Sequence, residues 1–264
     1  MHVLITSTQN PKIKSLLLLE KPRERKKQSV FVVEGKKEVM YAVEAGYQIQ
    51  NIFFCEEIIS AQTLLELKLN DRLLIPVSRE VFDKIAVRES TGGMIAVAEQ
   101  KPHRLEDIQL SKNPLLLVLE SVEKPGNLGA ILRTADAAGV DAVIICDPQT
   151  DFYNPNVIRS SVGCVFTKQI ASATSEETIQ WLKKNDVNIF CTYLQASKPY
   201  YETDFTAPSA IIMGTEATGL SDNWVKNSTS NVIIPMQGII DSMNVSTAAA
   251  VVIFEALRQR GFKS

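Results

Sequence analysis

The chain has 264 residues, a length that suits two domains or one large α/β unit. Hydrophobic residues make up 45 % and charged residues 22 %, as in ordinary globular proteins, which excludes disordered, collagen-like and disulfide-rich classes. The only histidines are His2 and His103, and the four cysteines form no C-x-x-C pair, so the composition excludes most Ser/His, Cys/His and zinc mechanisms.

A basic run lies near the start of the chain. Residues 21–27 hold five cations and one anion, after an apolar stretch with helical spacing at residues 13–19. Residues 1–105 carry 16 Lys and Arg against 13 Asp and Glu, while residues 106–264 carry 12 against 17. The run suits RNA phosphates, although a solvated charged turn explains it about as well. Its candidate RNA-binding residues are Lys21, Arg23, Arg25, Lys26 and Lys27.

The rest of the first hundred residues alternates apolar strands with short helical segments. Strands are predicted at residues 30–34, 49–55, 73–77 and 94–98, and helices at residues 36–45, 64–69 and 78–87. Residues 1–99 are therefore predicted to form a small α/β domain. A polar stretch with proline follows, so we expect a linker at residues 100–113.

Residues 114–264 have the pattern of a second α/β domain. Mostly apolar strands are predicted at residues 115–119, 142–146, 187–192, 210–213 and 232–234. Helices are predicted from the spacing of the apolar residues between and after these strands, at residues 129–138, 155–162, 175–184 and 245–258. The fold class is therefore α/β, with a mostly parallel sheet and helices on both faces.

Polar segments follow three of these strands. In the first, Asn127 is a good N-cap for a helix whose apolar stripe turns Arg133 toward a polar face. Taken alone, Arg133 is explained more simply by a surface ion pair with Asp136.

The second segment, residues 214–220, places a carboxylate between two glycines, which let a ligand approach the backbone closely. A simple strand-to-helix turn is the alternative. In the third, residues 234–244 form a loop before an Ala-rich helix, which Asn244 could merely cap. Both loops leave strand ends, where open α/β sheets bind ligands, so they are predicted to line one pocket.

Two common nucleotide-binding patterns are absent from the chain. No G-x-G-x-x-G follows the first strand of the second domain, which disfavours NAD, and no G-x-x-x-x-G-K-[ST] indicates an NTPase. No signal peptide or run of about 18 apolar residues occurs, so we expect a cytoplasmic protein that contacts no membrane.

Three motifs occur in order in the second domain: N-x-G-x-x-x-R from Asn127, G-x-E-x-x-G-L from Gly214, and I-P-M-x-G-x-x-x-S-x-N from Ile234. Together they resemble the SpoU (TrmH-type) RNA methyltransferases of the SPOUT class. The resemblance spans about residues 114–258, and residues 1–99 look like the substrate-binding domain common in that family. Met243 stands where the family usually has leucine, a change that conserves volume.

The resemblance implies a C-terminal trefoil knot, a homodimer, and S-adenosylmethionine as cofactor. It also implies methylation of a ribose 2′-hydroxyl, with ribosomal RNA as the expected substrate and no metal. A transfer RNA substrate, or an RNA-binding module without activity, is the alternative.

The resemblance further implies the site residues. The catalytic residues would be Arg133, Asn127, Glu216, Ser242 and Asn244. The cofactor would be bound by Gly214, Ile234, Met236, Met243, Thr192, Leu194 and Gly219. For Arg133 we expect phosphate binding and electrostatic activation, because a guanidinium group does not give up its proton readily.

Overall fold

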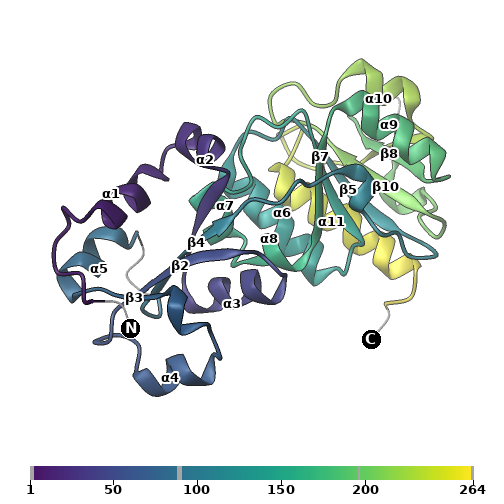
Figure 1. Ribbon diagram of the computed structural model, residues 1–264. Helices are drawn as coiled ribbons and strands as arrows, with labels where there is room; N and C mark the ends of the chain where they lie inside the picture. Colours follow the sequence, from purple (N-terminus) through teal and green to yellow (C-terminus); the bar gives the residue numbers. More distant parts are fainter. Residues whose placement is uncertain (1–2, 88–90, 196, 263–264) are drawn as a thin grey trace. The chain divides into compact units, whose positions relative to one another are not determined.

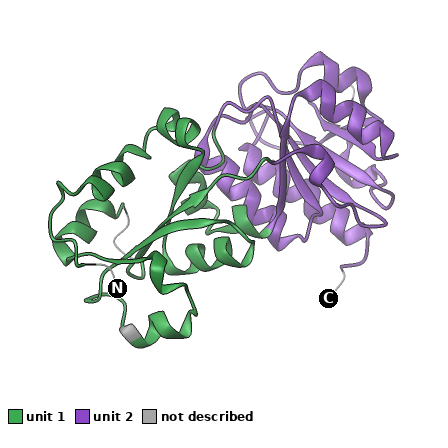
Figure 2. Cartoon of the chain, viewed as in Figure 1, with its two compact units in different colours: residues 1–102, 151–167 green, residues 103–150, 168–264 purple. Residues whose placement is uncertain are grey.

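The computed structural model describes residues 3–87, 91–195 and 197–262; His2 lies outside them. The chain divides into two compact units (Figure 2): unit 1 is residues 1–102 and 151–167, and unit 2 is residues 103–150 and 168–264. The sequence analysis placed residues 151–167 in the second domain, and the structure places them in unit 1. The boundary after Pro102 lies within the predicted linker.

Unit 1 contains a four-stranded sheet within its described residues (Figure 1). In sheet order the strands are β1 (Val30–Glu34), β4 (Met94–Glu99), β2 (Ile49–Phe54) and β3 (Leu74–Pro76). Strand β4 is antiparallel to both of its neighbours, and β2 is parallel to β3. The helices of residues 1–102 are α1 (Pro11–Leu18), α2 (Pro22–Gln28), α3 (Lys36–Glu44), α4 (Ala61–Glu66) and α5 (Arg79–Ile85).

The basic run forms helix α2 rather than a turn. Its Lys and Arg side chains are exposed with one exception, Arg25, which is fully buried. The Nε of Arg25 donates to Asp151 Oδ2 at 2.8 Å, and its Nη1 donates to the carbonyl oxygens of Leu19 and Glu20, each at 2.8 Å. Because one side of the helix faces the interior, Arg25 is a structural residue. We remove it from the predicted RNA-binding set.

Residues 151–167 join unit 1 through apolar contacts. They form α7 (Pro155–Ser160), which packs against β1, and α8 (Cys164–Thr167), which packs against α3. The ring of Tyr153 stacks on Phe31 with 4.1 Å between centroids. A fragment that begins after Pro102 would expose this apolar surface, so studies of the cofactor site need the full chain.

Unit 2 contains a seven-stranded sheet within its described residues, and all of its paired strands are parallel. In sheet order the strands are β7 (Gln169–Ala173), β6 (Ala142–Cys146), β5 (Leu115–Glu120), β10 (Ser209–Met213), β8 (Asn188–Thr192), β11 (Ser230–Ile233) and β9 (Lys198–Pro199). The predicted parallel sheet is confirmed, and β7 and β9 are additions to it.

Helices cover both faces of this sheet, as predicted (Figure 1). On one face, α9 (Ser175–Lys184) and α10 (Asp222–Asn227) share an apolar core with the sheet, in which Trp224 is fully buried. On the other, α6 (Pro125–Ala137) and α11 (Val245–Gln259) pack against each other and the sheet. Every residue of β5 and β10 is buried, which explains the apolar runs at residues 115–119 and 210–213. The trefoil knot stays a prediction.

Candidate cofactor and substrate site

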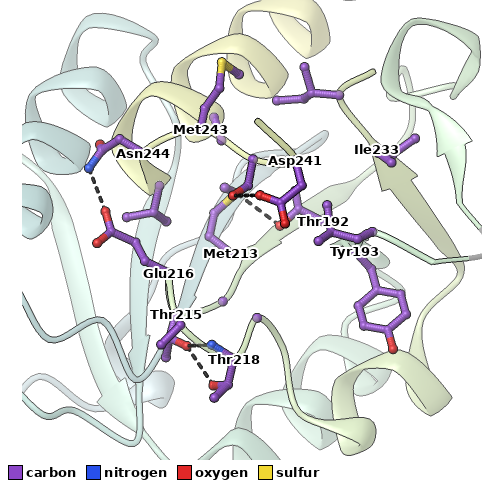
Figure 3. A pocket seen from close by; sticks show the side chains of 18 of the residues that line it. Thr192, Tyr193, Met213, Thr215, Glu216, Thr218, Ile233, Asp241, Met243 and Asn244 are labelled. Carbon is purple, nitrogen blue, oxygen red and sulfur yellow. Dashed lines mark hydrogen bonds between the residues drawn. The ribbon is translucent and has the colours of Figure 1, made fainter. Parts of the chain in front are cut away.

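A cavity of about 750 Å³ lies at the carboxyl ends of strands β8, β10 and β11 (Figure 3). Its size is typical of small-molecule sites, and open parallel sheets bind ligands at this edge. The structure brings every predicted cofactor-binding residue into its lining: Gly214, Ile234, Met236, Met243, Thr192, Leu194 and Gly219. Glu216, Ser242 and Asn244 of the predicted catalytic set line it as well.

One wall of the cavity is the tight loop that follows β10. The backbone N–H of Thr215 donates to Gly219 O at 3.1 Å, and the Gly219 N–H donates back to Thr215 O at 3.1 Å. A Cβ atom on Gly214 would lie 2.3 Å from the carbonyl carbon of Gly219. The loop itself therefore requires glycine at position 214, whereas the sequence analysis attributed this glycine to the approach of a ligand.

The opposite wall is the loop between β11 and α11. Asn244 is the N-cap of α11, because its Oδ1 accepts a hydrogen bond from Ser246 N at 3.0 Å. Ser242 Oγ donates to Asp241 Oδ1 at 3.0 Å. Asp241 is a second carboxylate in the lining, in addition to Glu216. The sequence analysis did not select Asp241, since only its position in this loop identifies it.

Two predicted catalytic side chains, Asn127 and Asn244, meet a third, Glu216, although the three lie on separate segments. Figure 3 shows the contact between Asn244 and Glu216. Asn127 Nδ2 and Asn244 Nδ2 donate to Glu216 Oε1 at 2.9 and 2.7 Å. Asn244 Nδ2 also lies 3.1 Å from Asn127 Oδ1. Hydrogen bonds from Lys124 and then Asn127 lower the pKa of the Glu216 carboxyl, so this group is ionised at neutral pH.

Asn127 has a different local role from the predicted one. Helix α6 begins at Pro125, with Lys124 at the N-cap position, so Asn127 lies inside the first turn. Proline is common at the first position of a helix, because its φ is already helical and its missing N–H is not needed there. The predicted N-cap was therefore wrong. The Asn127 side chain is left to bind Glu216.

Arg133 lies apart from this network. It is exposed on α6 and absent from the lining of the cavity, and no hydrogen bond or ion pair joins it to another described residue. Asp136 was the ion-pair partner that the sequence suggested for Arg133, but its Oδ1 lies 3.8 Å from Lys168 Nζ. The guanidinium group of Arg133 is thus accessible to a phosphate.

Glu120, at the end of β5, is a buried carboxylate that is only 8 % exposed and is not among the residues predicted from the sequence motifs. Its Oε2 accepts a hydrogen bond from the Ser221 N–H at 2.8 Å. Its Oε1 accepts hydrogen bonds from Ser221 Oγ at 2.6 Å and from Ser175 Oγ at 3.3 Å. Ser221 directly follows the loop of residues 214–220. Glu120 therefore holds the end of the loop of residues 214–220. A charged residue that closes an apolar strand was the signal available in the sequence.

We expect Glu120→Gln to weaken S-adenosylmethionine binding about tenfold, because an amide cannot accept hydrogen bonds at both positions and the loop end loosens. Calorimetry on the full chain measures this affinity. Ser209→Ala is the matched control, since Ser209 is also buried but lies at the start of β10, the end away from the loop of residues 214–220. It should lower thermal stability and leave affinity unchanged. Wild-type affinity in Glu120→Gln would show that Glu120 is only structural.

The described residues contain no group of three or more His, Cys, Asp or Glu that could hold a metal ion. Burial raises the pKa of the Cys146 and Cys191 thiols to about 12, so both remain protonated at neutral pH.

None of the described helices has the length and apolar character to cross a membrane.

Comparison with known proteins identifies the family. The model of the SpoU rRNA Methylase family matches residues 114–254, which include the whole Glu216 network, and an MRM3-like substrate binding domain matches residues 10–96. The chain belongs to the SpoU rRNA methylase family. The resemblance found in the sequence motifs is thereby confirmed.

Solved structures and curated relatives of this SpoU protein match nearly its full length. An AdoMet-bound rRNA methyltransferase from Sinorhizobium meliloti is 29 % identical, with a TM-score of 0.90 and 99 % of each chain covered. A structure described as an RNA 2′-O ribose methyltransferase is 38 % identical, with a TM-score of 0.84, covering 98 % of this chain and 99 % of the other. The 23S rRNA (guanosine(2553)-2′-O)-methyltransferase RlmP of Bacillus subtilis is 29 % identical over 95 % of this chain and 97 % of its own.

Proposed function

We propose that this chain transfers a methyl group from S-adenosylmethionine to a ribose 2′-hydroxyl of ribosomal RNA. The observation that carries the proposal is the Glu216 network beside a ligand-sized cavity, built from the three motifs of the SpoU family. Two relatives that match at least 92 % of the chain are named as 2′-O-methyltransferases of 23S rRNA, which favours ribosomal over transfer RNA.

The residues around the cavity of about 750 Å³ fit S-adenosylmethionine, which supplies an activated methyl group on a sulfonium centre. Ile234, Met236 and Met243 offer an apolar surface for the adenine ring. The carboxylate of Asp241 lies in the lining together with that of Glu216, which is paired with Lys124, and negative groups there suit a ligand that carries positive charge.

In the proposed mechanism the side chains act mainly by positioning. Asn127 and Asn244 hold Glu216 rigidly, so the cavity wall is organised before the substrate binds. A ribose hydroxyl is a weak nucleophile, and a nearby cation stabilises the negative charge that develops on its oxygen. Arg133 has the free guanidinium group for this role and for binding the adjacent phosphate.

Mapping 2′-O-methylation in cells with and without the protein would test the substrate. We expect one or more sites to be lost from ribosomal RNA in the deletion strain, and to return when the wild-type protein is restored. Loss of sites from transfer RNA alone would show that the substrate is transfer RNA and not ribosomal RNA. If the protein were an RNA-binding module without activity, its deletion would remove no methylation site.

The exposed cations of α2 are proposed to capture RNA. Neutralising Lys21, Arg23, Lys26 and Lys27 should weaken binding to all RNA sequences alike, and each phosphate interaction removed should reduce the slope of log affinity against log salt by about 0.7 to 0.9. Filter binding across a salt series measures this. Affinity for S-adenosylmethionine should not change, and an unchanged salt slope would show that these charges are only solvated.

The homodimer and the cytoplasmic location also remain proposals. Helix α11 leaves Phe254 41 % exposed and the preceding loop leaves Ile240 65 % exposed, which is apolar surface that a second copy could bury.

A further inference from the structure

A second, smaller cavity lies next to the cofactor cavity. It has a volume of about 210 Å³, and it shares Gly214, Thr215, Glu216, Ala217 and Val245 with the lining of the larger one. Its other wall comes from the loop after β5 and the first turn of α6: Val122, Glu123, Lys124 and Asn127. The loop that carries Glu216 therefore separates the two cavities, and Lys124 is the cation of the smaller one.

Lys124 is held by an exposed ion pair. Its Nζ bonds to Glu216 Oε2, and the Lys124 side chain is 68 % exposed whereas that of Glu216 is 29 % exposed. Such pairs contribute little to stability, because water solvates both charges well. The ammonium group can thus leave Glu216 at small cost.

Glu216 does not depend on Lys124 for its position. The two amide groups of Asn127 and Asn244 both bind Oε1, whereas Lys124 binds Oε2. When Lys124 departs, the carboxylate keeps both amide hydrogen bonds and exposes Oε2 to water. The cofactor-site wall should therefore survive the loss of the ion pair.

We propose that Lys124 exchanges Glu216 for a backbone phosphate of the RNA, so that the smaller cavity receives the sugar-phosphate backbone beside the target ribose. The inference rests on the proposed function, because it assumes an RNA substrate at this site. A phosphate carries a full negative charge, and its binding to Lys124 releases a condensed counterion, which gives the exchange its driving force. Arg133, which lines neither cavity, is not the cation of this interaction.

The test compares Lys124→Gln and Lys124→Arg with the control Lys226→Gln in the full chain. Lys226 is also exposed and ion-paired, to Asp222, but it lines neither cavity. In Lys124→Gln the slope of log RNA affinity against log salt should fall by about 0.7, and the KM for RNA should rise severalfold. Lys124→Arg should restore the slope, and Lys226→Gln should match the wild type.

Calorimetry with S-adenosylmethionine alone separates this role from a structural one. Lys124→Gln should bind the cofactor within twofold of the wild type. An unchanged salt slope would overturn the proposal, and so would a slope that fell equally in Lys226→Gln. A loss of cofactor affinity without a change in slope would mean that Lys124 only supports Glu216. Failure of the wild type to methylate ribose would contradict the proposed function instead, since the salt slope is measured without turnover.

Discussion

Replacing Arg133 by alanine is expected to lower methyl transfer by a factor of about 10² to 10³ while leaving S-adenosylmethionine affinity close to that of the wild type. The reason is its position, since Arg133 is exposed on α6, bonded to no other described residue and absent from the cofactor cavity. Its contribution should therefore arise only when the RNA is bound. Single-turnover kinetics together with calorimetry measure the two quantities separately.

Two further variants test whether the guanidinium group of Arg133 itself is required. Arg133→Lys should recover little activity, because an ammonium group cannot form the paired hydrogen bonds of a guanidinium with a phosphate. Arg104→Ala is the control, since Arg104 is also an exposed arginine of unit 2 but pairs with Asp107. Equal losses of rate and cofactor affinity in Arg133→Ala would make Arg133 a cofactor-binding residue, and wild-type activity would make it a surface charge.

Replacing Gly214 by alanine should weaken S-adenosylmethionine binding by more than about 100-fold. Its Cβ would lie 2.3 Å from Gly219 C and 2.6 Å from Leu220 N, and both are backbone atoms that cannot move without opening the loop. The loop would lose its paired hydrogen bonds between Thr215 and Gly219. Calorimetry on the folded variant measures the affinity.

Gly238→Ala is the matched control for this glycine. Gly238 lies in the loop of the opposite wall, and a Cβ there would meet nothing within 4 Å. It should bind the cofactor like the wild type. If Gly214→Ala also bound normally while remaining folded, residues 214–219 would not form the cofactor-binding wall.

Elements with a strong apolar pattern could be predicted from the sequence, and elements defined by distant contacts could not. The buried strands β5 and β10 contain apolar runs at residues 115–119 and 210–213, so their positions were evident. Strand β9 has two residues and pairs only with β11, which leaves no periodicity to detect. Residues 151–167 have ordinary helical spacing, and nothing local shows that they complete the core of unit 1.

In the candidate site, too, residues in sequence motifs could be predicted, whereas residues defined by distant contacts could not. The motifs selected Asn127, Glu216 and Asn244, and the structure brings them within hydrogen-bonding distance. The burial of Arg25 could not be foreseen, because its partner Asp151 lies 126 residues away. Lys124 and Glu120 were missed for a related reason, since their partners lie on distant segments: Glu216 for Lys124, and Ser221 and Ser175 for Glu120.

The most direct test of the central claim incubates the purified full chain with ribosomal RNA and methyl-labelled S-adenosylmethionine, and then digests the RNA to nucleosides. The proposed function predicts that the label appears on the ribose 2′-oxygen of ribosomal RNA, and that Arg133→Ala nearly abolishes it. Label on a base, or no incorporation by a chain that binds the cofactor, would contradict it.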